Sequence, residues 1–418
     1  MVNRKVAPKL STITHIPLIS PEILTLENGA KIYTIRESND ATVRVDFVFN
    51  AGSAMSTGIA SDMTAELLLS GTDTQSSEEI DEKIDTLGGY TDVKAATEKT
   101  SVTVFGLLEF IVPITEIVID AVKNATFHEK ELKQAISENK KRLEIRLKKG
   151  KTMAQRTFIK HLLEGSPYAD IIELEDFKNC SRESLVEFHR DVLLKSLSHI
   201  NIVGAVSEEQ LNAIKELGNQ FSCELNPDLK YEIENRPKTI HIAKEGALQT
   251  AVRIGKMMFN KTHPDFKKLA VVNTILGGYF GSRLMTSIRE EKGYTYGIGA
   301  GIIQLKETGY FYISSEVAAE HKDATIAAIK EEIEILQTEK VGAEELELVK
   351  SYLIGQLLES SDGAQSMMDR FHSTHYFGLT LSYYDDLIKT INEITPEEIQ
   401  FYANEYLKWE DMSIVTVG

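Results

Sequence analysis

The same series of sequence patterns occurs twice along the chain, and this repeat constrains the fold more than any other feature. Residues 89–91 read Gly-Tyr-Thr between a helical and a strand pattern, and residues 293–295 read the same in the same setting, 204 positions later. Chance alternation of apolar residues would reproduce part of this pattern, but the shared order of elements favours duplication. We therefore predict two homologous halves. The other matching segments are strands 43–49 and 251–255, helices 111–124 and 321–336, and segments 201–203 and 413–415.

Each half combines strands and helices in an order that favours an α+β fold. Strand patterns neighbour one another like hairpins and are followed by helical patterns, which is typical of helices packed on a mostly antiparallel sheet. The 418 residues suffice for two cores, since single cores rarely grow beyond about 250 residues. The apolar pattern lapses around residues 226–237. We therefore expect an N-terminal half at 1–225, a linker at 226–237 and a C-terminal half at 238–418.

Turn and capping signals locate the elements of the first half. A proline-containing arm at 1–42 includes Asn28-Gly29, which predicts a hairpin. Ser76 followed by Glu79 predicts a capping box at the start of a helix. The expected helices are 58–69, 76–87, 111–124, 128–149, 151–163 and 185–194, and the expected strands are 43–49, 90–96, 101–107 and 200–206.

The charge balance argues against a nucleic-acid partner. The net charge is -17, whereas binding to phosphates requires a basic stripe on the surface. One basic cluster runs from Lys140 to Lys151 in a helical pattern whose apolar side carries Leu143 and Leu147. This arrangement favours a solvated helix face over the alternative, a binding patch.

Cysteine usage and hydropathy exclude two further classes. Cys180 and Cys223 have no ligand-like spacing, so neither a disulfide framework nor a structural zinc site is predicted. No run of 18 apolar residues occurs, and the first ten residues lack the apolar region of a signal peptide. We expect no membrane partner and a cytoplasmic location, or a periplasmic one if a signal peptide has been removed.

The stretch from Gly277 to Ala300 holds the candidate site. Phe280, Leu284 and Ile288 have the spacing of one helical face, which predicts a short helix with a buried apolar side. The sequence Lys292-Gly293 is typical of a helix end, and the residues that follow have an extended pattern. The stretch is therefore expected to form a helix, a glycine reversal and a strand.

Arg289 and Tyr296 lie on either side of this reversal. Arg289 falls in the last helical turn and Tyr296 seven residues later, so a reversal at Gly293 can aim both side chains at one place. A guanidinium and a phenol together suit a peptide carbonyl or a developing oxyanion. Spacing alone leaves open a plainer interpretation, in which Arg289 pairs with Glu290 or Glu291 and Tyr296 is a half-buried strand residue.

Residues 277–284 read Gly-Gly-Tyr-Phe-Gly-Ser-Arg-Leu, and residues 288–296 read Ile-Arg-Glu-Glu-Lys-Gly-Tyr-Thr-Tyr. This closely resembles the C-terminal signature of the pitrilysin/insulinase-type zinc metallopeptidases and mitochondrial-processing-peptidase-like proteins. The resemblance implies two homologous halves arranged as a clamshell. It also implies that Arg289 and Tyr296 belong to an active site, lent across a chamber to a zinc ion held by the other half or by a partner subunit.

The zinc motif of that family is replaced in this chain. The first helix of a catalytic half carries His-x-x-Glu-His, which places both imidazoles and the general base on one face. Here the framing residues 58–60 are kept, but Ser61, Thr64 and Ala65 stand at the His, Glu and His positions. Two hydroxyls and a methyl group cannot hold zinc with useful affinity. We expect no metal and no cofactor in this chain.

No other cluster of residues replaces this site. Glu66 is expected to face solvent or cap a neighbour, and Glu138, on the later helix where the family has another glutamate, is a lone carboxylate. His372 and His375 lie at i and i+3 of a helical pattern without a visible third ligand, so a packed or surface pair is favoured over a metal site. A phosphate loop, a Gly-x-Ser-x-Gly elbow and a Cys/His nucleophile arrangement are also missing from the sequence.

The resemblance extends over nearly the whole chain and implies a non-catalytic subunit of a heteromeric zinc metalloendopeptidase. Such a subunit is inactive alone, and its partner is a homologous, zinc-binding, His-x-x-Glu-His peptidase subunit that cleaves peptides, as in two-chain bacterial systems. Two alternatives remain: a structural or interaction protein in which Arg289 and Tyr296 are leftovers, and a chaperone that encloses peptides without cutting them. Retention of both residues favours the peptidase role.

Overall fold

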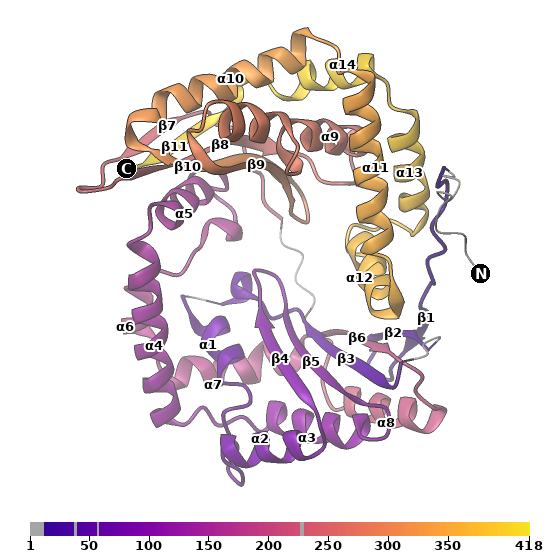
Figure 1. Cartoon of the computed structure of the whole chain (residues 1–418). Helices are drawn as coiled ribbons and strands as arrows, with labels where there is room; N and C mark the ends of the chain where they lie inside the picture. Colours follow the sequence, from indigo (N-terminus) through magenta and orange to yellow (C-terminus); the bar gives the residue numbers. More distant parts are fainter. Residues whose placement is uncertain (1–11, 37–39, 57, 226–229) are drawn as a thin grey trace.

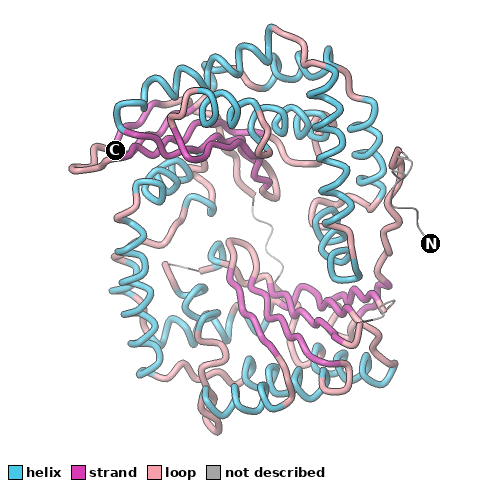
Figure 2. Tube along the Cα trace, in the orientation of Figure 1, coloured by secondary structure: helices cyan, strands magenta, loops and turns pink. Residues whose placement is uncertain are grey.

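Two β-sheets face each other across the middle of the molecule, and each carries helices on its outer side (Figure 1, Figure 2). The computed structural model describes residues 12–36, 40–56, 58–225 and 230–418. Each sheet has its own hydrophobic core, one centred on the first sheet and one on the second. Parts of the expected arm and linker, residues 1–11, 37–39 and 226–229, lie outside the described residues.

The first sheet has the strand order β1-β2-β6-β3-β5-β4. Neighbouring strands are antiparallel except β2 and β6, which are parallel. The hairpin predicted at Asn28-Gly29 joins β1 to β2. The strand bounds are β1 Glu22–Thr25, β2 Lys31–Ile35, β3 Thr42–Phe49, β4 Tyr90–Ala95, β5 Thr100–Leu107 and β6 Leu197–Val203.

The second sheet repeats this topology in the order β7-β11-β8-β10-β9. Its single parallel pair, β7 with β11, occupies the place of β2 with β6, and the other neighbours are antiparallel. This equivalence confirms the predicted α+β fold with two related halves. β4 is the last strand of the first sheet and β9 is the last strand of the second, so these two strands form equivalent edges. The bounds are β7 Thr239–Ile242, β8 Gln249–Met258, β9 Thr295–Gln304, β10 Gly309–Ala318 and β11 Ser413–Val417.

The helices follow the sequence patterns closely. The predicted capping box is present, because the Ser76 hydroxyl accepts from the Glu79 backbone and the Glu79 carboxylate accepts from the Ser76 backbone. The helix predicted at 58–69 is shorter, because buried Leu67 and Leu68 continue the apolar pattern within a turn. The helices of the first half are α1 Ala60–Glu66, α2 Ser77–Thr86, α3 Ile111–Lys123, α4 Glu129–Leu147, α5 Gly150–Leu162, α6 Asp176–Asn179, α7 Arg182–Asp191 and α8 Glu208–Gly218. Those of the second are α9 Phe266–Asn273, α10 Lys322–Thr338, α11 Ala343–Glu359, α12 Gly363–His375, α13 Ser382–Glu393 and α14 Pro396–Tyr406.

Each half contributes one helix to the sheet of the other half. Phe158 of α5, from the first half, is buried in a cluster with strand residues of the second sheet, including Val415 and Val417. Met368 of α12, from the second half, is buried against Tyr33 and other residues of the first sheet. This exchange ties the two sheets together at both sides of the molecule (Figure 1). Among the described helices, none is long and apolar enough to cross a membrane.

Candidate functional site

The stretch that carries the Arg289 and Tyr296 pair has the predicted order of helix, reversal and strand. A π-helix spans Met285–Glu291, and the left-handed backbone of Gly293 (φ 67°) reverses the chain before β9. Leu284 and Ile288 are fully buried, as the spacing predicts. Phe280 is not, because residues 279–282 form a turn rather than helix, and its side chain is 66% exposed. The prediction that Phe280 shares the buried face is therefore wrong.

Exposed Phe280 instead supports Arg289. The Arg289 guanidinium carbon lies 4.7 Å from the centre of the Phe280 ring, a cation–π contact that orients the charged group without neutralising it. Within the described part of the chain, the Arg289 guanidinium contacts the Phe280 ring and forms no ion pair with Glu290 or Glu291, so the plainer interpretation of this residue is not supported. The guanidinium keeps its hydrogen-bond donors available.

Two further signature residues fix the position of this stretch. A side-chain carbon at Gly277 would lie 2.7 Å from the backbone nitrogen of Ala300, so only glycine permits this approach to β9. Arg283 binds Glu345 of α11 through two hydrogen bonds of 2.8 and 2.9 Å. This ion pair raises the pKa of Arg283 and ties the turn before the π-helix to the outer helices.

Tyr296 is directed into solvent by a β-bulge. Ser315 pairs with Ile298 but Val317 pairs with Thr295, so Tyr296 and Gly297 of β9 stand opposite Glu316 alone. Simple alternation would place Tyr296 on the buried face with Ile298, whereas its side chain is 92% exposed. The interpretation of Tyr296 as a half-buried strand residue is therefore wrong.

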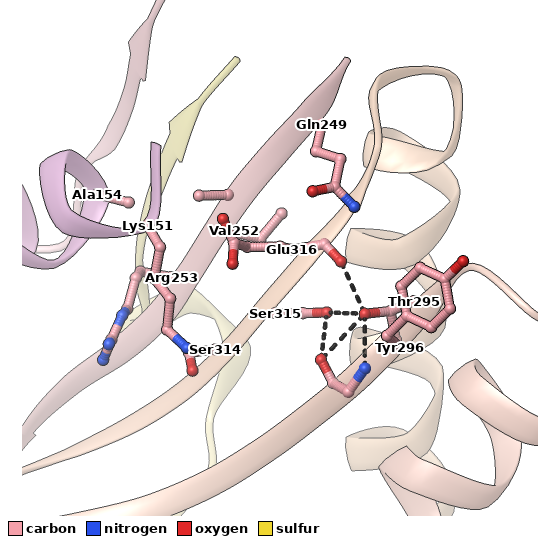
Figure 3. A pocket seen from close by; sticks show the side chains of 12 residues that line it. Lys151, Ala154, Gln249, Val252, Arg253, Thr295, Tyr296, Ser314, Ser315 and Glu316 are labelled. Carbon is pink, nitrogen blue, oxygen red and sulfur yellow. Dashed lines mark hydrogen bonds between the residues drawn. The ribbon is translucent and has the colours of Figure 1, made fainter. Parts of the chain in front are cut away.

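Side-chain hydrogen bonds stabilise the bulge (Figure 3). The Thr295 hydroxyl donates to the Glu316 carbonyl at 2.7 Å and accepts from the Gly297 backbone at 3.1 Å. The Ser315 hydroxyl lies 2.9 Å from the Thr295 hydroxyl and 3.0 Å from the Gly297 carbonyl. The Glu316 carbonyl and the Gly297 backbone groups at the bulge thus have hydrogen-bond partners close by, and the exposed position of Tyr296 is built into the sheet.

Tyr296 lines a pocket of about 340 Å³ between α5 and strands β8, β10 and β9. Arg289 is not among the residues that line it. The convergence of Arg289 and Tyr296 on one substrate atom therefore stays a prediction. Two cationic residues that the sequence does not mark as site residues, Lys151 and Arg253, do line the pocket. Lys151 ends the basic cluster that the sequence pattern places on a solvated helix face, and Arg253 is a lone charge in a strand pattern.

The replaced zinc motif lies on α1 in the first half. Ser61, Thr64 and Ala65 are all buried, and the Thr64 hydroxyl has no hydrogen-bond partner in the described chain. The Ser61 hydroxyl donates to Asp62 at 3.1 Å, and burial raises the pKa of the Asp62 carboxyl. These groups do not fit a zinc ion, because none supplies the imidazole or thiolate donors that zinc prefers.

The nearby carboxylates are engaged elsewhere. Glu66 is exposed and accepts from the Asn139 amide of α4 at 2.7 and 2.8 Å, as expected for a solvent-facing or capping residue. Glu138 accepts from Gln134 on the exposed side of α4. Over the described residues, no group of three His, Cys, Asp or Glu side chains is arranged to hold a metal ion.

His372 and His375 form a packed pair between α12 and the first sheet, as expected. The His372 Nε2–H donates to the Asn201 amide oxygen at 2.6 Å, and the His372 ring stacks on His199 with 4.9 Å between the ring centres. His375 lies 2.9 Å from the Tyr33 hydroxyl. Burial lowers the pKa of His372 to about 4 and also lowers those of His199 and His375. The cluster joins the two halves as neutral imidazoles at neutral pH.

Comparison with known proteins agrees with this architecture. Residues 31–165 match the family model "Insulinase (Peptidase family M16)" and residues 179–353 match "Peptidase M16 inactive domain". The chain is 22% identical to the uncharacterized zinc protease YmxG of Bacillus subtilis, covering 94% of this chain and 97% of that protein. It is 21% identical to the probable mitochondrial-processing peptidase subunit beta of Arabidopsis thaliana, covering 98% and 81%. A crystal structure of a peptidase M16 inactive domain from Pseudomonas fluorescens has the same fold, with a TM-score of 0.84, 22% identity and coverage of 96% and 98%.

Proposed function

Because the chain belongs to the insulinase-type M16 peptidase family as a non-catalytic, peptidase-like member, we propose that it is one subunit of a two-chain zinc peptidase. A homologous partner with an intact His-x-x-Glu-His motif would hold the zinc, and this chain would supply Arg289, Tyr296 and part of the chamber wall. The observation that carries the proposal is the contrast between a first-half motif replaced by small buried residues and a second-half signature that keeps Arg289 and an exposed Tyr296.

The geometry of Tyr296 supports a role outside this chain's own packing. Its side chain is 92% exposed, and its phenol forms no hydrogen bond within the described chain. A bulge with its own hydrogen bonds holds it there, although an exposed aromatic ring contributes little to folding. A phenol and a guanidinium that donate to a substrate carbonyl or a tetrahedral oxyanion stabilise the transition state by about 3 kcal/mol per donor in comparable sites.

The sheet edges support peptide as the substrate. β4 and β9 each end a sheet, so one side of each strand has backbone groups unpaired by another described strand. An extended peptide adds to such an edge through main-chain hydrogen bonds, which require no particular side chains. A relative that matches 98% of this chain over 81% of its own length is named as a probable subunit of a processing peptidase, which supports a partner for this chain as well.

The proposal is tested by mixing the purified chain with a His-x-x-Glu-His homologue from the same genome. We expect a stable complex that cleaves peptides, whereas this chain alone does not. Arg289→Ala in the complex should lower turnover about a hundredfold without weakening assembly. If the complex forms but Arg289→Ala and Tyr296→Phe both leave turnover unchanged, the chain is an interaction or peptide-binding subunit without a catalytic contribution, and the proposal fails.

A further inference from the structure

Arg253 is a charged side chain in the middle of the second sheet without an anionic partner. It lies on β8, pairs through its backbone with Ser314 and Val415, and is partly buried. Its guanidinium carbon lies 5.1 Å from the Tyr312 ring centre, but across the described residues the side chain has no hydrogen bond and no ion pair. Arg44 on the equivalent strand β3, by contrast, is paired with Asp46 and Asp369.

An unpaired, partly buried guanidinium is unfavourable. Burial removes water from the group and lowers the pKa of Arg253 from its ordinary value. The Tyr312 ring offsets part of this cost but supplies no acceptor for the guanidinium donors. The guanidinium donors of Arg253 are therefore open to an acceptor from outside the described chain, and a negatively charged acceptor would compensate the burial of the charge best.

Arg253 lines the same pocket of about 340 Å³ as Tyr296. Lys151 of α5 lines it too, and among the lining residues described Glu316 is the only carboxylate. In Figure 3, Lys151 and Arg253 extend along one side of the pocket and the Tyr296 ring stands on the other. No atom lies within 4 Å of the position that a side-chain carbon would take at Gly297, so this part of the pocket is open.

The start of α5 adds to the positive character of the pocket. Gly150, the first residue of α5, approaches the second sheet, where a side-chain carbon would lie 3.4 Å from the Val417 carbonyl and 3.7 Å from Ala251. The free N–H groups at a helix N-terminus favour negative charge nearby. The helix belongs to the first half, so both halves of the chain contribute to this pocket.

We propose that this pocket, the Arg253 pocket, binds a carboxylate group of the peptide substrate, with Arg253 as the principal contact and Lys151 as a second one. The inference rests on the proposed function, because it takes the ligand to be a peptide presented beside Tyr296. A guanidinium fork matches the two oxygens of a carboxylate. The chain would thereby select peptides that carry an acidic side chain or a free C-terminus near the bond to be cleaved.

The test measures equilibrium peptide binding to the full chain alone by calorimetry, without a partner or turnover. Three otherwise identical peptides are compared: one with an internal Glu and an amidated end, one with Gln and a free C-terminal carboxylate, and one with Gln and an amidated end. We expect at least one carboxylate peptide to bind about tenfold more tightly than the uncharged peptide. The peptide that shows the advantage identifies the source of the carboxylate.

Substitutions then assign the effect to the pocket. Arg253→Gln should abolish the advantage of the carboxylate peptide, Arg253→Lys should keep part of it, and Glu316→Gln should increase it by removing the opposing charge. Lys330→Gln is the matched control, because Lys330 lies on α10 and pairs with Glu334 away from the pocket. Exposed Lys151→Gln, expected to weaken binding severalfold, covers the case in which Arg253→Gln does not fold.

Equal binding of all three peptides, or an advantage that survives Arg253→Gln in a folded protein, would overturn the inference. Neither result depends on a partner. A chain that discriminates the peptides but gives no active complex would remove the proposed function and leave the pocket as a peptide-carboxylate site. An active complex formed by a chain that binds all three peptides equally would support the proposed function and remove the Arg253 pocket as a carboxylate site.

Discussion

The edge strands β4 and β9 occupy equivalent places in the two sheets but differ in backbone and chemistry. β4 pairs with β5 in unbroken register, whereas β9 has a bulge opposite Glu316 that exposes Tyr296. At the 204-residue spacing that aligns the two Gly-Tyr-Thr motifs, Tyr296 corresponds to Asp92. The two edges share one topology, but the bulge in β9 and a tyrosine at the position of Asp92 give the second edge a phenol that is 92% exposed.

The same contrast applies to the helical segments that precede these strands. In the first half, α1 places Ser61 and Thr64 in the core, where they contact protein rather than solvent. In the second half, the π-helix holds Arg289 over an exposed Phe280. Burial in one half and exposure in the other is what we expect if only the second signature still meets a substrate.

The largest expected effect comes from Tyr296→Phe in the complex with a zinc-binding partner. Removal of one hydroxyl should lower turnover about a hundredfold, because a donor to the transition state is lost while the exposed ring is kept. Ser61→Ala, which removes one hydroxyl from the other half, should change turnover less than twofold. Steady-state peptide hydrolysis at matched complex concentration measures both, and a larger loss in Ser61→Ala would reverse the assignment of the two halves.

Gly277→Ala should destabilise the second half by about 1–3 kcal/mol, because the added carbon meets β9 at 2.7 Å. Gly297→Ala is the matched control, since its added carbon meets open space. Urea unfolding followed by circular dichroism compares the two variants. Equal midpoints would show that the close approach between the signature and β9 is not a constraint.

Acid should loosen the contact of α12 with the first sheet more than that of α5 with the second. His372 has its pKa lowered to about 4 by burial, so the unfolded chain binds protons first as the pH falls below about 6.5. The stability that the neutral imidazole contributes is present above pH 6.5 and is lost between about pH 6.5 and 4, a change of up to about 3 kcal/mol. Unfolding measured across this range should depend less on pH in His372→Gln. A pH dependence unchanged by this substitution would contradict the assignment.

Phe280→Leu should have the smallest effect. The substitution removes the ring beneath Arg289 but leaves an exposed apolar side chain, so stability should not change. A cation–π contact at an exposed site contributes about 0.5–1 kcal/mol, which corresponds to a two- to fivefold loss of turnover in the complex. The variant should still cleave every peptide that the wild type cleaves. A loss of turnover as large as that of Arg289→Ala would mean that Phe280 itself contacts the substrate.

Local signals in the sequence predicted the elements of this fold well. The Asn28-Gly29 hairpin, the Ser76 capping box and the reversal at Gly293 each depend on residues close together in the chain, so the sequence alone contains the information. The equivalence of the halves was visible for the same reason, because duplicated elements keep their order.

Features that depend on distant partners were not predictable. The bulge at Tyr296 is defined by the register against β10, which lies beyond the next turn. The apolar stripes of α5 and α12 predict burial but do not say which sheet covers them, and each crosses to the other half. Arg253 becomes notable only because no acceptor among the described residues reaches it in the fold, a property that no sequence pattern records.

The central claim, that the first half has lost its capacity for metal while the second keeps its active-site signature, is tested most directly by zinc binding. The purified full chain is dialysed against zinc, freed of excess metal by gel filtration and analysed by mass spectrometry. Because Ser61, Thr64 and Ala65 offer no zinc ligands, the account predicts less than about a tenth of a zinc ion per chain. One tightly held zinc ion per chain would contradict it.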